Sequence, residues 1–148
     1  MTEIDFHVGA ADRLAYACRL LRKALAKGVR PAATAPAATL AQLDKLLWTF
    51  DPLEFLPHVR VTAGAEVTAR LRTTPLWLVE TPADAPWHEV LVNLGDDIAP
   101  GFESFARLIE IVPDDEGPRQ AARRRWKHYA DRGYKLSTHT VKAGGRDG

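Results

Sequence analysis

The chain has 148 residues, 46% hydrophobic and 26% charged, which predicts one globular domain with a substantial core. The net charge of +1 argues against a general nucleic-acid binder, because such domains are basic throughout. A single cysteine, Cys18, excludes an intramolecular disulfide and fits a reducing compartment, so we expect a cytoplasmic protein. We expect neither a membrane span nor a signal peptide, since the chain has no run of 18 apolar residues and begins with an acidic segment.

Predicted strands and helices alternate in the first half of the chain. Residues 4–8 alternate apolar and polar side chains, as in a strand, and residues 12–27 carry apolar side chains at helical spacing. The Ala- and Pro-rich residues 29–38 could form a linker, but their place between two helices favours a short strand. A Thr-x-x-Gln capping box predicts that the second helix starts at Thr39. This alternation predicts a layered α/β fold whose sheet is at least partly parallel.

An aromatic segment follows the second predicted helix. It contains Trp48, Phe50, Phe55 and Leu56. These are too many apolar side chains for an exposed loop. The segment therefore either folds onto the core or forms a patch that meets another subunit. His58, which follows this segment, is predicted to be structural rather than catalytic.

The second half of the chain contains further strand-like runs. We predict strands at residues 76–80, 89–94 and 108–112. Residues 63–74 are polar and are expected to be mobile, and residues 102–106 are predicted to form a short helix. Residues 134–141 alternate weakly and are expected to form a short extended tail. We expect one domain over residues 1–142 and a disordered end over residues 143–148.

A basic segment near the C-terminus is the most distinctive feature of the sequence. We predict a helix from Glu116 to Arg132, with Pro118 in its first turn and Gly133 just after its end. Seven basic and two acidic residues lie between positions 116 and 135, a local charge of +5 in a chain whose total is +1. This count predicts that the positive charge is concentrated in this segment rather than spread for solubility.

The predicted helix places cations beside an indole. At about 100° per residue, Arg119, Arg123 and Lys127 share one edge, and Trp126 lies next to it. Such a border suits an anionic partner that also carries an apolar group. The alternative is an ordinary solvated basic helix whose aromatic side chains face the core.

The sequence contains no recognisable catalytic or cofactor-binding pattern. The phosphate-binding loop GxxxxGK[ST] is absent, and the turn after the first strand lacks the second and third glycines of a dinucleotide-binding loop. GxSxG, HExxH and paired cysteines are absent, and the five histidines lack the spacing of metal ligands. We therefore expect a protein without catalytic activity, cofactor or metal.

The C-terminal third resembles the chi subunit family of bacterial DNA polymerase III holoenzyme. The matching residues are Phe105, Ile109, Val112, Pro113, Arg123, Trp126, Lys127, Tyr129, Gly133, Tyr134, Leu136 and Thr138. A second patch is also similar to the family, and it comprises Leu47, Trp48, Phe55, Pro57 and His58. The lengths agree over nearly the whole chain.

The resemblance implies a Rossmann-like domain, with helices on both faces of its sheet and no working nucleotide site. It implies a clamp-loader adaptor that binds the acidic C-terminal tail of single-stranded DNA-binding protein (SSB), which ends in Pro-Phe, and reaches the clamp loader through psi. The implied SSB-tail site comprises Arg119, Arg123, Trp126, Lys127, Val112 and Thr138. The implied psi contact comprises Trp48 and Phe55. Relatives often carry Tyr where this chain has Trp126, so the pocket shape can differ.

The residues are also compatible with two other functions. The first is direct binding of single-stranded nucleic acid, with Trp126 and Tyr134 as stacking platforms and arginines on the phosphates. Little such binding is expected, because the rest of the chain does not look basic. The second is a nucleotide-dependent enzyme on an α/β scaffold, and the missing phosphate loop argues against it.

Overall fold

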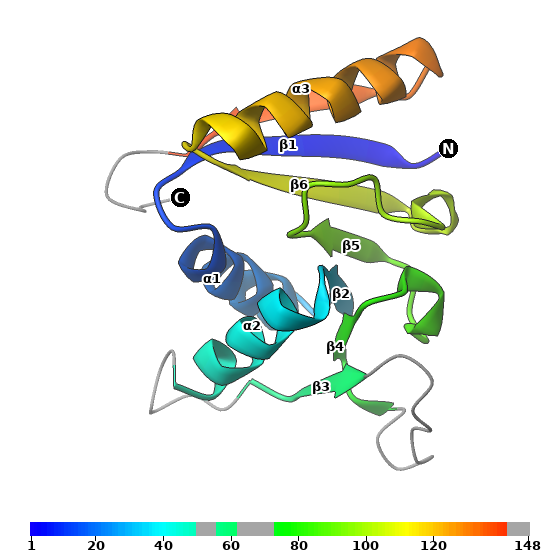
Figure 1. Cartoon of the computed structure of the whole chain (residues 1–148). Helices are drawn as coiled ribbons and strands as arrows, with labels where there is room; N and C mark the ends of the chain where they lie inside the picture. The colour runs from blue at the N-terminus through cyan, green and yellow to red at the C-terminus, as the bar shows by residue number, and fades with distance from the viewer. Residues whose placement is uncertain (50–55, 62–72, 142–148) are drawn as a thin grey trace.

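The computed structural model describes residues 1–49, 56–61 and 73–141, which form one layered α/β unit around a parallel sheet (Figure 1). The seven strands of the described residues run in the order β3-β4-β2-β5-β6-β1-β7, and every neighbouring pair is parallel. The strands are β1 (Glu3–Ala10), β2 (Pro31–Thr34), β3 (His58–Val61), β4 (Leu76–Val79), β5 (Val90–Asn93), β6 (Arg107–Pro113) and β7 (Leu136–Thr140). The helices are α1 (Arg13–Ala26), α2 (Ala37–Thr49) and α3 (Glu116–Asp131), with short 3-10 turns η2 (Pro82–Asp84) and η3 (Phe102–Ser104).

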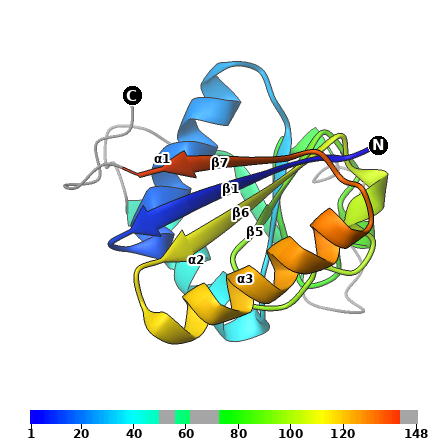
Figure 2. The same cartoon turned by 90° about the horizontal axis from the view of Figure 1, so that it is seen from above.

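The helices lie on both faces of the sheet, as predicted. Helices α1 and α2 pack together on one face, and α3 lies on the other, alongside β6 and β1 (Figures 1 and 2). Each face therefore has its own core. Cys18, Leu21 and Leu43 are buried between the sheet and helices α1 and α2, whereas Phe6 and Tyr129 are buried between the sheet and α3.

The first half of the chain follows its local sequence signals. In β1, Ile4 and Phe6 are buried on the α3 side, in agreement with the predicted alternation. Helix α1 starts where Asp12 caps it by accepting a hydrogen bond from the Ala15 N–H, at 3.1 Å. Gly28 follows the helix with φ of 80°, a left-handed conformation that glycine adopts at little cost.

The Ala- and Pro-rich segment does form a strand, as favoured above. All four residues of β2 are buried between β4 and β5. Pro31 is the first residue of this strand, a position where the missing N–H is tolerated in a sheet. Runs predicted as strands at residues 76–80, 89–94 and 108–112 are confirmed as β4, β5 and β6.

Two sequence predictions are wrong, and one strand was missed. Helix α2 begins at Ala37, so Thr39 lies in its first turn and is not the N-cap, and the Leu40 N–H bonds instead to the Pro36 carbonyl. The aromatic segment runs into an edge strand, β3, that the sequence analysis did not predict. Residues 134–141 are not a tail, since β7 pairs with β1 from Leu136 to Thr140.

Several predictions fall on residues outside the described part of the chain. These residues are 50–55, 62–72 and 142–148, so the predicted roles of Phe50 and Phe55, most of the polar segment 63–74 and the tail from residue 143 are not described. Among the helices of residues 1–49, 56–61 and 73–141, none combines the length and the apolar character needed to cross a membrane.

Burial predicts that the Cys18 thiol is unreactive in the folded protein. Burial raises the pKa of this thiol to about 11, so the thiolate is scarce at pH 8. We expect a disulfide reagent such as 5,5′-dithiobis(2-nitrobenzoic acid) to react slowly with the native protein and within seconds in denaturing urea. A fast reaction of one thiol per chain without denaturant would contradict the buried position.

Candidate functional site

Helix α3 forms over the predicted residues because its ends carry clear signals. Pro118 occupies the first turn, and Gly133, with φ of 81°, follows the last. The side chains of Ala122, Arg125 and Tyr129 turn inward against the sheet. The helix is therefore amphipathic, although one of its inward residues is an arginine.

A buried ion pair joins α3 to the middle of the sheet. Arg125, only 2% exposed, lies 3.2 Å from the carboxylate of Glu110 on β6, which is fully buried. Tyr129 donates a 2.6 Å hydrogen bond to the other carboxylate oxygen, and Asn93 donates one of 3.0 Å to the first. Arg125 also donates to the Asp96 carbonyl at 2.5 Å. The network gives most of the polar atoms around Glu110 a partner.

Burial dominates the titration of this network. Burial raises the pKa of Glu110 above its ordinary value, and Arg125 is the largest of the groups that oppose the shift. Burial and the neighbouring Glu110 carboxyl raise the pKa of Tyr129, so its hydroxyl stays a donor at physiological pH. In the sequence, Arg125 is one of the seven basic residues between positions 116 and 135. Its buried partner cancels its charge, so the exposed charge of α3 is smaller than that count.

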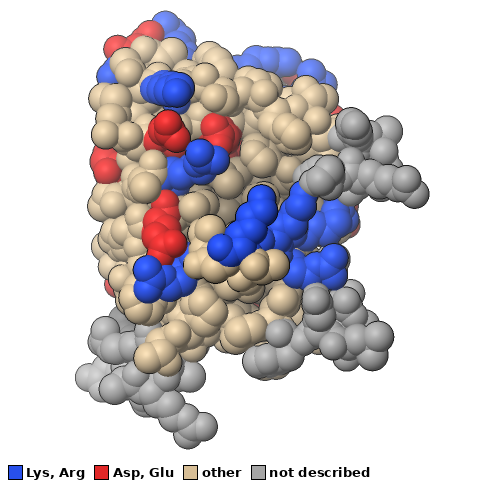
Figure 3. Space-filling view, turned by 180° about the vertical axis from the view of Figure 1, so that it is seen from behind, with Lys and Arg blue, Asp and Glu red and all other residues tan. Residues whose placement is uncertain are grey.

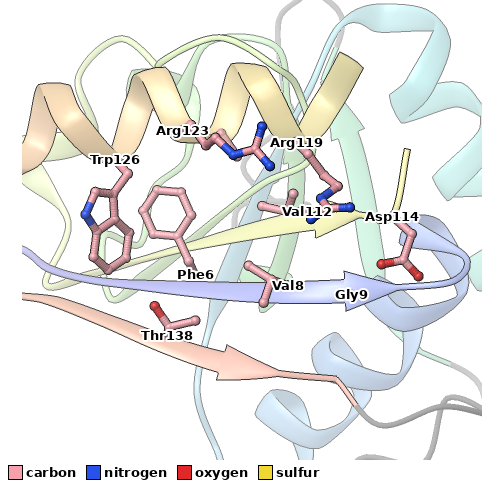
Figure 4. A pocket seen from close by; sticks show the side chains of 10 residues that line it. Phe6, Val8, Gly9, Val112, Asp114, Arg119, Arg123, Trp126 and Thr138 are labelled. Carbon is pink, nitrogen blue, oxygen red and sulfur yellow. The ribbon is translucent and has the colours of Figure 1, made fainter. Parts of the chain in front are cut away.

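A cavity of about 510 Å³ lies between α3 and strands β1 and β7 (Figure 4). We call it the α3 cavity. Its lining residues are Phe6, Val8, Gly9, Val112, Asp114, Arg119, Ala122, Arg123, Trp126 and Thr138. Figure 4 shows cations and apolar groups around one space, with the Arg119 and Arg123 side chains along the helix and the Trp126 indole at the other end.

The apolar part of the α3 cavity is built by rings and branched side chains. Trp126 is 36% exposed, and its ring meets that of Phe6 edge-on at a centroid distance of 5.1 Å. Val8 and Val112, from neighbouring strands in register, form the floor. An indole held in place by a second ring provides a fixed apolar wall for a ligand.

The charged part of the α3 cavity has one guanidinium group available. Within the described residues, Arg119 makes no ion pair or side-chain hydrogen bond. Arg123 pairs with Glu116 at 3.5 Å, but both side chains are more than half exposed, and such a contact contributes at most about 1 kcal/mol. Asp114 adds one carboxylate to the lining. The cavity can therefore receive an anion beside the arginines and an apolar ring beside Trp126.

A family model described as "DNA polymerase III chi subunit, HolC" matches residues 1–137. The chain belongs to the chi subunit family. The chi subunit of Pseudomonas aeruginosa is 37% identical over 147 residues, which cover 95% of this chain and 98% of that protein. That of Haemophilus influenzae is 30% identical, covering 70% of this chain and 69% of that protein. The chi subunit of Escherichia coli K12 is 27% identical, and the match covers 68% of this chain and 66% of that protein.

Among solved structures, the C-terminal domain of Dbp5 from S. cerevisiae, bound to Gle1 and IP6, has the same fold. The match has a TM-score of 0.62 and covers 95% of this chi-family chain and 90% of the Dbp5 domain. The sequences are only 10% identical, so the likeness concerns the α/β architecture alone.

The structure brings together five of the six residues that the resemblance implied for the SSB tail. Arg119, Arg123, Trp126, Val112 and Thr138 line the α3 cavity of this chi-family chain. Lys127 does not line it. Its ammonium group lies on the exposed side of α3, 3.3 Å from the Asp131 carboxylate.

Phe6, Val8 and Asp114 line the α3 cavity but were missed from the sequence. The alternation in residues 4–8 does place Phe6 and Val8 on one face, but it cannot say which helix covers that face. Asp114 follows β6 and gave no signal of its own. Among the described residues, no group of three or more His, Cys, Asp or Glu side chains is arranged to hold a metal ion.

The two residues implied for psi lie far from α3 in the sequence. Trp48, on α2, is 56% exposed, and its ring lies 4.8 Å from the His58 ring. His58 bonds to the Asp44 carboxylate at 2.9 Å and to the Leu56 carbonyl at 2.6 Å, so it ties β3 to α2. Phe55 lies outside the described residues.

The buried ion pair predicts a large loss of stability when one partner is removed. We expect Arg125→Met to lower the free energy of unfolding by about 3–5 kcal/mol, because it leaves the Glu110 carboxylate buried without its cation. Arg124→Ala, an exposed neighbour of equal charge, should change it by less than about 0.5 kcal/mol.

The pH dependence of this loss follows from the pKa of Glu110. Removing Arg125 removes the largest group that lowers this raised pKa, so the folded variant holds a proton that the unfolded chain releases. The stability of Arg125→Met is retained at low pH and lost as the pH rises through the folded pKa. Urea unfolding at pH 5 and pH 8 measures this, and equal losses at both values would contradict the buried pair.

Proposed function

We propose that this chi-family subunit is a non-catalytic replisome adaptor that binds the acidic C-terminal tail of SSB in the α3 cavity and reaches the clamp loader through psi. One observation carries the proposal. The α3 cavity joins two arginines to an apolar slot formed by Phe6, Val112 and Trp126. A peptide that ends in an aromatic residue offers the matching groups, a carboxylate and a ring, on a single residue.

The geometry supports a definite placement of the peptide. The terminal carboxylate pairs with Arg119, whose guanidinium fork matches two carboxylate oxygens, with Arg123 as second partner. The terminal phenyl ring packs against the Trp126 indole over the Val112 floor. Aspartates earlier in the peptide lie along the cationic edge of α3, where Lys127 contributes a longer-range attraction. Asp114, at the far side of Arg119, disfavours a second carboxylate there.

The strength of this contact follows from its size. A tail of a few residues gives roughly micromolar affinity, about −8 kcal/mol. Because exposed cations supply part of it, salt weakens the complex.

The alternative placement of a nucleic-acid strand on Trp126 and Tyr134 has less support. The Tyr134 ring is half-buried and packs against Phe102 and Tyr129, at 5.4 and 6.1 Å. It does not offer an open ring face next to Trp126 for a second base.

The psi contact is proposed around Trp48. A Trp that is more than half exposed beside a structural histidine provides a large apolar surface for a partner subunit. Phe55 extends this proposed contact by resemblance to the family. The two proposed contacts use different helices, so SSB and psi can bind together.

Substitutions in the α3 cavity should separate direct contacts from general charge. We expect Arg119→Ala, Arg123→Ala and Trp126→Ala each to weaken binding of an acidic peptide ending in Asp-Ile-Pro-Phe by about tenfold or more, since each removes a group that touches the last residue. Lys127→Ala should cost only about two- to threefold, through lost steering. Fluorescence anisotropy with a labelled peptide at two salt concentrations measures the loss of affinity for the three cavity variants and for Lys127→Ala.

Arg124→Ala is the matched control for this series. It removes the same charge from the same helix, but its side chain does not line the α3 cavity. If Arg123→Ala and Arg124→Ala weakened the peptide equally, binding would depend on net charge and the proposed placement would be wrong. A peptide that lacks the terminal Phe should bind at least tenfold more weakly to the unmodified protein.

For the psi contact, Trp48→Ala should abolish co-purification with psi while leaving peptide binding in the α3 cavity unchanged. Arg123→Ala should show the reverse pattern. Size-exclusion chromatography of the mixed subunits checks the first result. Retention of the psi complex by Trp48→Ala would place the contact elsewhere.

A further inference from the structure

A second concave surface lies on the opposite face of the sheet from α3. It has a volume of about 650 Å³, with α1 as its wall and strands β7, β1, β6 and β5 as its floor. We call it the α1 groove. Its polar lining includes Asp5, His7, Lys23, Lys27, Arg107 and His139. The groove runs across the flank of the sheet, and the core residues Leu21 and Val92 line its inner part.

This flank is polar because of the way the helices cover the sheet. Helix α3 packs on the other face, against β6 and β7, and α1 contacts β6 and β2. The α1 side of β1 and β7 therefore carries Asp5, His7, Ser137 and His139, while Ile4 and Phe6 point to α3. A sheet face with polar groups and rings is suited to binding rather than to packing.

The wall of the α1 groove carries two lysines, Lys23 and Lys27, from a basic stretch of the sequence. Positions 13–30 contain six basic residues and no acidic residue, a local charge of +6 that exceeds the +5 of the segment around α3. Four of the six do not line the groove, and two of those four are paired: Arg13 with Asp96 and Arg30 with Glu89. Figure 3 shows Lys and Arg side chains gathered on this side of the molecule, with few Asp or Glu among them.

Two of these cations line the groove one helical turn apart. Lys23 and Lys27 are both exposed, and residues at i and i+4 have Cβ atoms about 6 Å apart. Arg107 lines the floor and pairs with Glu3 and Asp5 at 3.3 and 3.2 Å. The two lysines thus present successive charges along the wall, a spacing that suits neighbouring phosphates of an extended strand.

Two rings lie on the floor of the α1 groove. His7 and His139 occupy a register pair of the parallel strands β1 and β7, and their ring centroids are 5.1 Å apart. The Tyr16 hydroxyl lies 2.5 Å from Nδ1 of His7 and holds that ring in place. His139, on the edge strand, is exposed. Imidazole faces can stack on unpaired bases.

We propose that the α1 groove binds a short segment of single-stranded DNA. The phosphates lie along Lys23 and Lys27, and the bases stack on His139 and His7. A duplex fits less well, because its base faces are already stacked and the rings lie at the bottom of a concave surface. The site lies across the sheet from the α3 cavity and does not depend on the function proposed there. A chi-family subunit would then contact the strand on which the polymerase acts as well as its protein partners.

Fluorescence anisotropy with a labelled 12-nucleotide dT strand at 50 mM NaCl tests this proposal on the full chain. The double substitution Lys23→Ala/Lys27→Ala should weaken binding about tenfold and reduce the salt slope by about 1.4, at about 0.7 for each phosphate contact. His139→Ala should weaken binding about fivefold with little change in the salt slope, and His139→Phe should retain affinity because the ring face remains.

The matched control is Lys45→Ala/Arg124→Ala, which removes two charges from exposed positions outside the groove. Equal weakening by this control would mean general electrostatic attraction and would overturn the proposal. Failure of the unmodified protein to bind dT, or tighter binding of a 12-base-pair duplex, would also overturn it. Arg119→Ala/Arg123→Ala should lose the acidic peptide but keep dT, so the two sites can fail independently. Circular dichroism melts verify that each variant is folded.

Discussion

The Glu110–Arg125 ion pair is the constraint on which the surfaces of this protein depend. Removing two charges from water is costly. The 3.2 Å contact offsets this cost only together with the hydrogen bonds that Tyr129 and Asn93 donate to Glu110. Its main structural effect is therefore orientation rather than net stability. Because Arg125 must reach the Glu110 carboxylate on β6, helix α3 can adopt only one orientation about its own axis.

That rotation determines what the rest of α3 can do. With Arg125 inward, Trp126 lies about 100° further around the helix, at the border between core and solvent. Arg123 and Arg119 then stand over the ends of β1 and β6, where Phe6, Val8 and Val112 form an apolar floor. The cationic and apolar halves of the α3 cavity are both consequences of one buried contact.

The sheet contributes side chains to both the α3 cavity and the α1 groove, because successive side chains of a strand point to opposite faces. In β1, Phe6 and Val8 face α3 and His7 faces α1, and β7 places Thr138 and His139 beside them in register. The likeness to the Dbp5 domain at 10% identity shows how little such a fold says about function. What distinguishes this chi-family chain is the chemistry that its residues add to each face.

Local signals in the sequence determined most of the helices and strands. Asp12 caps α1, Gly133 follows the end of α3, and alternation marks β1, because each depends on nearest neighbours along the chain. Gly133 is also one of the residues that carried the resemblance to the chi family. Thr39 shows the limit of such signals, because helix α2 begins at Ala37 although the capping box predicts a start at Thr39.

Tertiary structure decided which residues meet. Strand β7 is exposed over four of its five residues and alternates only weakly in the sequence, and only pairing with β1 makes it a strand. Arg125 looks like its exposed neighbours until β6 supplies Glu110. The α3 cavity and the α1 groove each combine segments about a hundred residues apart, and contacts of that kind depend on packing between elements, which no local pattern encodes.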